Sequence, residues 1–338
     1  MVGSLTTTVQ WLTDWETAAA LPAASGAAAP SADTLTLHHP DAHGVVLAGG
    51  KVAARCSVWT DGAIQFEGRP AGVIGHFAAT TRAGPAAGKL LEAATERIRQ
   101  AGLAAAIGPM DGNTWRRHRF LTERGDRPLF FLEADNSDEW PAWWQAAGFA
   151  PVANYYSAIT PDLAWEDARV PLAAQRLPAA GVTLRPLEPS RFEAELRAIH
   201  ALSVEAFAKN FLYTPIGPEE FIAQYRAMER RVRPEFVQLA EADGRLAGFC
   251  FAVPDLAQAA RGEAVTNLVT KTLAVRPGRR FAGLGAILVA AVRTAARHAG
   301  FRHMIHAYMH ADNSSLNLSA HEATVFRRYT LLAHRTAP

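Results

Sequence analysis

The segment from Thr272 to Ala286 restricts the fold of this chain more than any other. An apolar run predicts a strand that ends before Pro277, a loop with glycine and arginine follows, and an amphipathic helix begins near Gly285. Gly283 and Gly285 lack a Cβ, so backbone N–H groups of the loop and of the helix N-terminus can approach a ligand closely. The segment predicts an α/β layer with a site for a phosphate or pyrophosphate.

Two nucleotide-binding loops are excluded here. The segment has no Gly-Lys-Ser/Thr for a nucleoside triphosphate, and no third glycine or following acidic residue for a dinucleotide fold. From these residues alone, a plain connection between strand and helix is an equal alternative, with Arg279 and Arg280 at its rim.

The order strand, helix, strand occurs in both halves of the chain. The first half predicts a hairpin around Gly49-Gly50, then a strand at 72–77, a helix at 86–100 and a strand at 104–107. In the second half the elements are more clearly marked, and the predicted ranges are strands 182–186, 236–240, 246–253, 267–275 and 303–310, and helices 193–207, 219–231 and 285–299. The repeated order indicates a tandem duplication whose first copy has diverged.

At 338 residues the chain is long enough for two domains. Proline and glycine between Pro161 and Gly181 mark the best boundary. The expected division is an N-terminal extension at 1–35, a first domain at 36–160, a linker at 161–180 and a second domain at 181–338. We expect the Ala/Pro-rich part of the extension, residues 21–30, to be a mobile connector.

The sequence Arg280-Phe-Ala-Gly283-Leu-Gly285 resembles the coenzyme A loop of the GNAT (GCN5-related N-acetyltransferase) superfamily, which has the pattern Gln/Arg-x-x-Gly-x-Gly/Ala. Leu273-x-Val275-x-Pro277 precedes the loop, as in that family. The resemblance covers about 160 residues in the family's element order. It implies a mixed α/β fold of two GNAT-like domains in tandem.

The resemblance also implies acetyl-CoA as co-substrate and no metal. Backbone groups of one strand would pair with the pantetheine arm, N–H groups of the loop would hold the pyrophosphate, and an Asn after the next strand would contact the coenzyme. The residues carried over are Leu273, Ala274 and Val275 for the arm, Arg280, Phe281, Ala282, Gly283, Leu284, Gly285 and Ala286 for the loop, and Asn313.

The match to the family is weak at the catalytic acid. Many members carry a Tyr about seven residues after the Asn, whereas this chain has Ser319 and Ala320 there and lacks the Tyr-x-x-x-Gly-Phe ending. Ser319 or His321 would have to substitute as the acid, or these are ordinary residues on a helix surface.

A base must remove a proton from the attacking ammonium. Period-two alternation on the strand 303–310 places His306, Tyr308 and His310 on one face, beside the expected acetyl slot. His306 or Tyr308 would then face the site, or both are buried structural residues, or the base acts through a water chain. His303 points to the opposite face, so these histidines do not form a zinc site.

Substrate contacts in this family usually come from the connection between the first two helices, here residues 207–216. Phe211 and Tyr213 would form an aromatic wall for an amine, or they are packing residues.

The first copy lacks the features of a coenzyme site. Aligning the two helices places Gly88 on Gly285 and Ala83 on Arg280, and Pro85 removes one N–H from the loop. We therefore expect this half to be structural or to shape the substrate site. Its loop 108–115 either closes over a shared cleft or caps the sheet.

Composition excludes several classes. A net charge of +2 gives no reason to expect a nucleic acid partner. The chain has no run of ~18–20 apolar residues for a membrane span and no basic, apolar signal segment, so we expect a cytoplasmic protein. Its arginine and alanine usage is typical of a high-GC bacterium. Cys56 and Cys250 are expected to be buried free thiols, and no feature supports an oligomer.

The function that these features predict is N-acetyl transfer from acetyl-CoA to a primary amine of a small molecule or peptide, by direct attack. Two alternatives remain: a non-catalytic acyl-CoA-binding or regulatory module, and an aminoacyl-tRNA-dependent transferase. The intact coenzyme loop and the lack of a basic surface run argue against the second.

Overall fold

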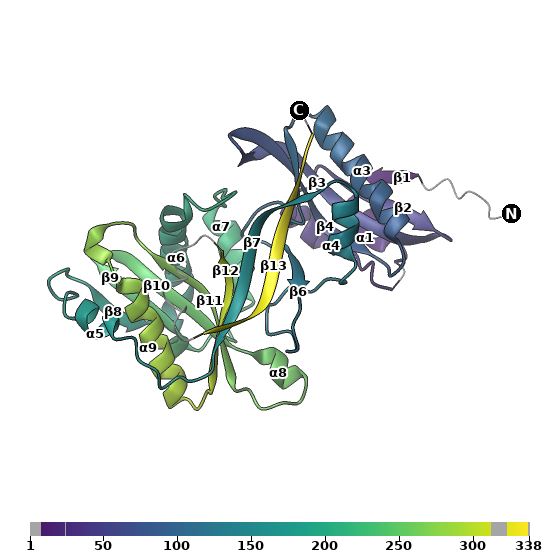
Figure 1. The fold of residues 1–338 in the computed structure, drawn as a ribbon. Coiled ribbons are helices and arrows are strands. Elements are labelled where there is room, and N and C mark those ends of the chain that lie inside the picture. Colours follow the sequence, from purple (N-terminus) through teal and green to yellow (C-terminus); the bar gives the residue numbers. More distant parts are fainter. Residues whose placement is uncertain (1–7, 24, 312–322, 337–338) are drawn as a thin grey trace.

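The computed structural model describes residues 8–23, 25–311 and 323–336. Two α/β halves lie side by side and share one sheet (Figure 1). The strands are β1 Val9–Leu12, β2 Ala42–Ala48, β3 Lys51–Phe66, β4 Arg69–Ala79, β5 Ala105–Gly108, β6 Phe120–Glu123, β7 Ala150–Thr160, β8 Thr183–Pro186, β9 Val237–Ala242, β10 Arg245–Pro254, β11 Asn267–Val275, β12 His303–His310 and β13 Thr324–Arg335. The helices are α1 Trp15–Ala20, α2 Ala32–His38, α3 Gly84–Gln100, α4 Trp140–Ala146, α5 Arg169–Ala174, α6 Phe192–Phe207, α7 Pro218–Arg226, α8 Leu256–Ala260 and α9 Leu284–His298.

The described strands form a 13-stranded sheet in the order β1-β2-β3-β4-β5-β13-β7-β12-β11-β10-β9-β8, with β6 added beside β13. Most neighbours are antiparallel, and the parallel pairs are β4–β5 and β11–β12. Each parallel pair is joined by a long helix, α3 or α9. This mixed sheet with helices on it confirms the expected mixed α/β tandem fold.

The last strands of the two halves are exchanged. β7, which ends the N-terminal half, pairs with β12 of the C-terminal half. β13, which ends the chain, pairs with β5 of the N-terminal half. The two strands also pair with each other from Thr324↔Ile159 to Ala333↔Ala150, and they run together between the halves (Figure 1). The second domain therefore does not extend unbroken to residue 338, because its last strand completes the sheet of the first.

The N-terminal extension differs from the expected mobile connector. β1 pairs with β2, and the Trp11 ring packs against Gly44 so closely that a Cβ there would lie 2.8 Å from it. Ala23 forms a bridge with Val52, and Ala27 is completely buried. Alanine is small and apolar, so an Ala-rich segment can pack flat against a sheet, and composition alone does not distinguish this from a free linker.

The segment expected as a linker is also packed. Its helix α5 lies against α9, Leu163 belongs to the core under α9, and the Trp165 carbonyl accepts a hydrogen bond from Arg293 at 3.0 Å. The segment that the prolines mark is therefore not a free linker, because its helix α5 packs against the start of α9.

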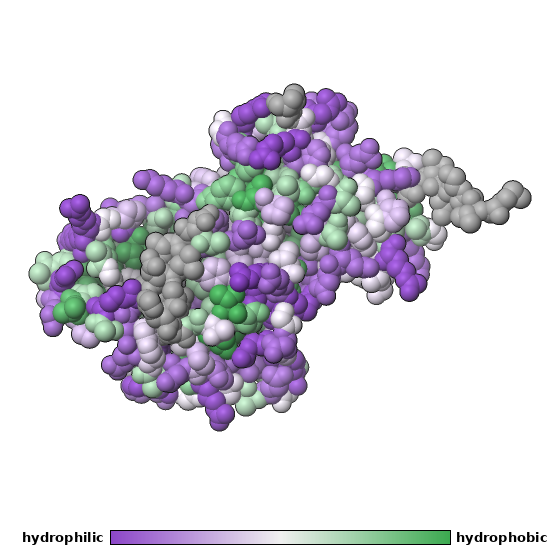
Figure 2. Space-filling model, viewed as in Figure 1, coloured by the Kyte–Doolittle hydropathy of each residue, from purple (hydrophilic) through white to green (hydrophobic). Residues whose placement is uncertain are grey.

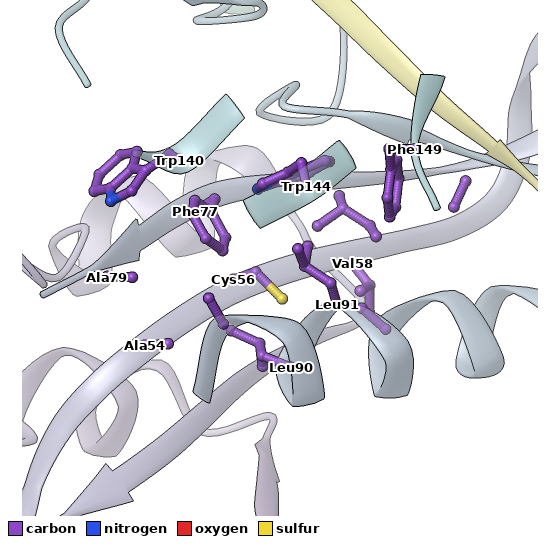
Figure 3. Packing of buried hydrophobic residues seen from close by; sticks show 14 of the residues in the cluster. Ala54, Cys56, Val58, Phe77, Ala79, Leu90, Leu91, Trp140, Trp144 and Phe149 are labelled. Carbon is purple, nitrogen blue, oxygen red and sulfur yellow. The ribbon is translucent and has the colours of Figure 1, made fainter. Parts of the chain in front are cut away.

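The core of the N-terminal half is built from aromatic rings. Trp140 and Trp144 of α4 meet Phe77 edge to face at 5.2 and 5.3 Å between ring centres. Figure 3 shows these rings over the strand that carries Cys56, with Leu90 and Leu91 of α3 pointing toward that strand. Cys56 and Cys250 are free and buried, as expected, and burial raises the pKa of both thiols.

A buried row of polar side chains crosses the N-terminal half. His43 Nδ1 and His76 Nδ1 lie 2.8 and 2.9 Å from Ser57 Oγ, and His38 Nδ1 lies 2.8 Å from His76 Nε2. Burial is the main cause that lowers the pKa of His38 to about 4 and those of His43 and His76 to about 3. The row is therefore neutral in the folded protein near pH 7.

This row predicts acid sensitivity. The three histidines have ordinary pKa values near 6.5 when unfolded, so the unfolded state binds more protons between pH 6.5 and about 4, and stability falls as the pH falls. Each histidine contributes up to ~1.4 kcal/mol per pH unit in that window. His43→Asn, which can keep the bond to Ser57, should make the pH dependence of the unfolding free energy shallower.

Urea unfolding at pH 4.5, 5.5, 6.5 and 7.5 measures this slope. His39→Asn is the matched control, because His39 is exposed and its φ of 50° is tolerated by Asn. An unchanged slope in His43→Asn would show that this histidine is not held neutral by the fold.

Candidate active site between strands β11 and β12

The two strands that frame the predicted site separate in their middle. β11 and β12 pair from Asn267↔His303 to Thr270↔His306, and no further pair follows although both strands continue. Lys271 is an extra residue in β11, because Thr270 and Thr272 face the adjacent residues Ala252 and Phe251 of β10. Past this bulge the edges diverge and open a cavity of about 1400 Å³.

The central cavity, as we call this space, is lined by both halves. β11, β12, α6, α7 and the start of α9 supply one part of its wall, and residues 114–119 and 132–134 of the N-terminal half supply another. The loop after β5 therefore closes over a shared cleft, one of the two roles considered for it. Trp115 anchors this loop, since its Nε1 donates to the Thr214 carbonyl at 2.8 Å.

Most of the residues predicted for the coenzyme line the cavity. They are Leu273, Ala274, Val275, Phe281, Gly283, Gly285 and Ala286. Because β11 pairs with β10 on its other side, the backbone of this stretch is free to face the cavity. Gly283 has a φ of 87°, and a Cβ there would lie 2.9 Å from the Cβ of Ala173 in α5. Glycine is therefore required both by the turn and by the packing of α5.

Three residues of the predicted loop are not among those that line the cavity. The Arg280 guanidinium lies 2.5 Å from an Asp243 oxygen and donates to the Ala180 carbonyl at 2.6 Å. Asp243 raises the pKa of Arg280, and this pairing ties the loop to the β9–β10 turn. Leu284 is buried in the core below α9, and Ala282 lies on the outer side of the loop, exposed. Asn313 lies outside the described residues.

The expected common face of His306, Tyr308 and His310 is wrong. Between His306 and Met309 the register of β12 against β7 shifts, and Tyr308 has a φ of 58°. One extra residue interrupts the alternation of side chains. His306 lies on the α9 side, where burial and Arg293 lower its pKa to about 4 and its Nε2 lies 3.1 Å from Thr160 Oγ1. All three side chains nevertheless line the central cavity.

Tyr308 is turned toward the N-terminal half instead. Its hydroxyl donates to the Leu132 carbonyl and accepts from the Ala134 N–H, both at 3.1 Å. Burial raises the pKa of Tyr308 to about 12, so this phenol serves to join the halves. Ser319, Ala320 and His321 lie outside the described residues.

The two aromatic residues predicted for the substrate line the cavity. Tyr213 lies beside Trp115 with ring centres 5.7 Å apart, and its hydroxyl is buried with no hydrogen-bond partner among the described residues. Phe211 is partly exposed and lies between His310 and Phe66 at 6.2 and 6.3 Å. Both residues therefore bridge the halves as well as forming the cavity wall.

Two cations at the cavity escape detection from the sequence. Lys271 extends over the Tyr308 ring at 4.3 Å, and burial together with Arg119 lowers its pKa to about 7. Arg119 lies over the rings of Tyr155 and Tyr308 at 4.0 and 4.7 Å. A lysine within an apolar strand is a weak signal, and Arg119 belongs to a basic run in a loop, where no periodicity reports burial.

An acidic residue at the cavity, Glu133, is already paired with neighbouring side chains. Glu133 forms an ion pair with Arg327, whose Nε lies 3.0 Å from one carboxylate oxygen and whose Nη2 donates to the other at 3.3 Å. It also accepts hydrogen bonds from the Tyr329 hydroxyl and from the Phe130 N–H. Burial raises the pKa of Glu133, while Tyr329 and Arg327 oppose this shift. Because Arg327 and Tyr329 belong to the exchanged strand β13, that strand fixes the charge balance of the cavity.

The equivalent place in the N-terminal half is closed. Gly75 and Gly108 allow β4 and β5 to stay together: a Cβ on Gly75 would lie 2.0 Å from the Met110 carbonyl oxygen. The Trp144 ring fills the space at Gly108, where a Cβ would lie 2.5 Å from it, and Trp143 covers Gly84 at the start of α3. These contacts support the expectation of a degraded coenzyme site in the first copy.

The comparisons with known proteins agree with this geometry. Residues 179–320 match the family described as the acetyltransferase (GNAT) family, so the likeness covers the part of the chain that carries the glycine loop. No curated protein sequence matches the chain.

Solved structures show the fold of the whole chain. The glucosamine N-acetyltransferase region of a fungal multi-domain β-N-acetylglucosaminidase is similar over 97% of this chain and 38% of its own, with 15% identity and a TM-score of 0.53. A GCN5-related N-acetyltransferase from Anabaena variabilis is similar over 97% of this chain and 73% of its own, with 10% identity and a TM-score of 0.50. A tandem GNAT protein from the clavulanic acid biosynthesis pathway is similar over 98% of this chain and 99% of its own, with 15% identity and a TM-score of 0.49. The likeness to the first two, with TM-scores of 0.53 and 0.50, establishes the fold and not the substrate.

On the face in Figure 2 hydrophobic residues form separate patches among hydrophilic ones. Among the helices of the described residues, none is long and apolar enough to cross a membrane.

The location of the coenzyme is testable with a pair of matched glycines. Gly285 lies in the first turn of α9 and lines the cavity, so Gly285→Leu should fill the pyrophosphate position without straining the helix. Gly88 is its equivalent in α3, where a Cβ would meet nothing within 4 Å. We expect calorimetry to give one equivalent of bound acetyl-CoA in the wild type and in Gly88→Leu, and none in Gly285→Leu.

Two equivalents in the wild type, or loss of binding in Gly88→Leu, would contradict this location. Thermal unfolding of both variants checks that the fold is kept.

Proposed function

We propose that this protein transfers an acetyl group from acetyl-CoA to a primary amine in the central cavity. The observation that carries the proposal is the separation of β11 from β12, which leaves strand backbone and a glycine loop along one continuous space. The match to the GNAT family supports an acyl-CoA-dependent transferase, and the closed first copy supports a single coenzyme site. In this proposal the thioester lies beside residues 271–273, whose backbone N–H groups polarise its carbonyl.

Lys271 is the proposed general base. An amine whose pKa is near 7 is half unprotonated at neutral pH and can accept a proton from an incoming ammonium. The charged groups that face it are Arg119 and Glu133, with the Tyr308 ring below. His306 also lines the cavity, but it is less suitable because burial and Arg293 lower its pKa to about 4. Tyr308 is less suitable because both of its hydrogen bonds are made.

The atoms balance without a covalent intermediate. The acceptor ammonium loses one proton to Lys271, its nitrogen forms the C–N bond, and the C–S bond breaks. The nitrogen then loses its second proton. One of the two protons ends on the CoA sulfur and the other is released to solvent, so Lys271 returns to its free state. Neither cysteine is needed, since both thiols are buried with raised pKa values.

This role predicts a distinctive pH profile. The rate should rise with pH through about 7 as Lys271 loses its proton. Lys271→Ala should lower kcat by about 10²-fold, the usual size of a general-base effect, and should abolish that rise while acetyl-CoA still binds. Lys89→Ala, at an exposed lysine that does not line the cavity, is the control. An unchanged profile in Lys271→Ala would assign the base elsewhere.

The assay is release of CoA thiol with a panel of primary amines. Binding of acetyl-CoA with no turnover of any amine would favour the non-catalytic acyl-CoA-binding alternative. Absence of binding would contradict acetyl transfer altogether and favour the aminoacyl-tRNA-dependent alternative.

A further inference from the structure

Arg119 is a cation with no acidic partner among the described residues. Its Nε donates to the His118 carbonyl at 3.0 Å, and its Nη2 lies 2.5 Å from His118 Nε2. The remaining nitrogen, Nη1, is buried and has no hydrogen-bond partner in residues 8–23, 25–311 and 323–336. The groups that act on the Arg119 charge are the phenols of Tyr155, Tyr308 and Tyr329, and not carboxylates.

His118 is fixed so that it cannot compensate this charge. Its Nδ1 lies 2.9 Å from the Arg116 carbonyl, which accepts only from a protonated nitrogen. Nε2 is therefore the acceptor for Arg119. Burial and Arg119 keep the pKa of His118 well below its usual range, so the imidazole is neutral and only positions the guanidinium.

The rings of Tyr155 and Tyr308 hold the Arg119 guanidinium from their faces. Such stacking leaves the edge of the guanidinium free for a planar anion, which it binds through two parallel hydrogen bonds. Burying a cation is costly unless an opposite charge completes the site. The structure thus holds Arg119 ready for an anion that the described residues do not supply.

The same region has excess positive charge. Lys271 and Arg119 both lie over the Tyr308 ring, at 4.3 and 4.7 Å, so the two cations are neighbours. Lys271 also lowers the pKa of His118, and Arg119 lowers the pKa of Lys271. The nearby carboxylate Glu133 is already engaged by Arg327 and Tyr329. A neutral or cationic acceptor would therefore enter an uncompensated positive field, whereas a carboxylate would balance it.

The wall next to these cations is aromatic. The Trp115 ring lies 5.7 Å from those of Tyr213 and Phe221 and 6.3 Å from that of Phe207. Trp115 and Arg119 come from the same loop of the N-terminal half, so one segment offers an apolar surface and a carboxylate site to the cavity of the other half.

We propose that the acceptor is an amine that also bears a carboxylate and has an apolar body, with the carboxylate bound at Arg119 and the amine directed to Lys271. This inference rests on the proposed function for the role of the amine. The diverged first copy then has a function of its own, because it contributes the acceptor site to a transferase whose coenzyme site is in the second copy.

Binding of a carboxylate without an amine tests the site independently of turnover. The probe is 3-phenylpropionate, titrated by calorimetry into the full chain. We expect binding to the wild type and a loss of affinity of about 10- to 100-fold in Arg119→Met, because a charge-assisted pair is removed. Arg69→Met is the matched control, since Arg69 is an exposed arginine of the N-terminal half that does not line the cavity. It should leave the affinity unchanged.

Turnover then tests the acceptor class. Wild-type kcat/KM should be higher for L-phenylalanine than for phenethylamine, which lacks the carboxylate. Arg119→Met should reduce that ratio by about 10- to 100-fold, and Arg69→Met should not. A merely structural role for Arg119 would lower both rates together and leave the ratio unchanged.

The outcomes separate the two proposals. No binding of 3-phenylpropionate to the wild type, or equal binding to Arg119→Met, overturns the carboxylate site even if amines are acetylated. Binding that depends on Arg119 with no turnover of any amine supports the carboxylate site and contradicts acetyl transfer.

Discussion

The pairing of β7 with β13 is the contact on which the rest of this structure depends. Each strand ends one half of the chain and lies against the sheet of the other. The exchange makes one sheet of two domains and sets the N-terminal loop beside the opening between β11 and β12. It also brings Arg327 and Tyr329 to Glu133, so that this carboxylate is already paired.

The local part of the fold could be predicted from sequence. The strands 267–275 and 303–310 have the expected bounds, because proline, glycine and apolar runs delimit them locally. The exchange of β7 and β13 could not be predicted, since it pairs residues more than 140 positions apart. The apolar patterns of these strands would suit either sheet. The predicted face of Tyr308 was wrong because one inserted residue reverses the alternation, and no composition marks that bulge.

The candidate site, too, could be predicted from the sequence only in part. Seven of the predicted coenzyme residues line the cavity. They could be predicted because the strand, the glycine loop and the helix that carry them are consecutive in the sequence. Lys271 and Arg119 acquire their properties only where the halves meet. Burial lowers the pKa of Lys271, and two tyrosines from separate strands hold Arg119. In the first copy the Trp144 ring fills the space at Gly108.

A crystal structure of the full chain with acetyl-CoA would test the central claim most directly. The proposed function predicts one coenzyme molecule, with pantetheine between β11 and β12, pyrophosphate at residues 283–286 and the thioester next to Lys271. Coenzyme bound at α3 of the N-terminal half, or a thioester remote from Lys271 and Arg119, would contradict it.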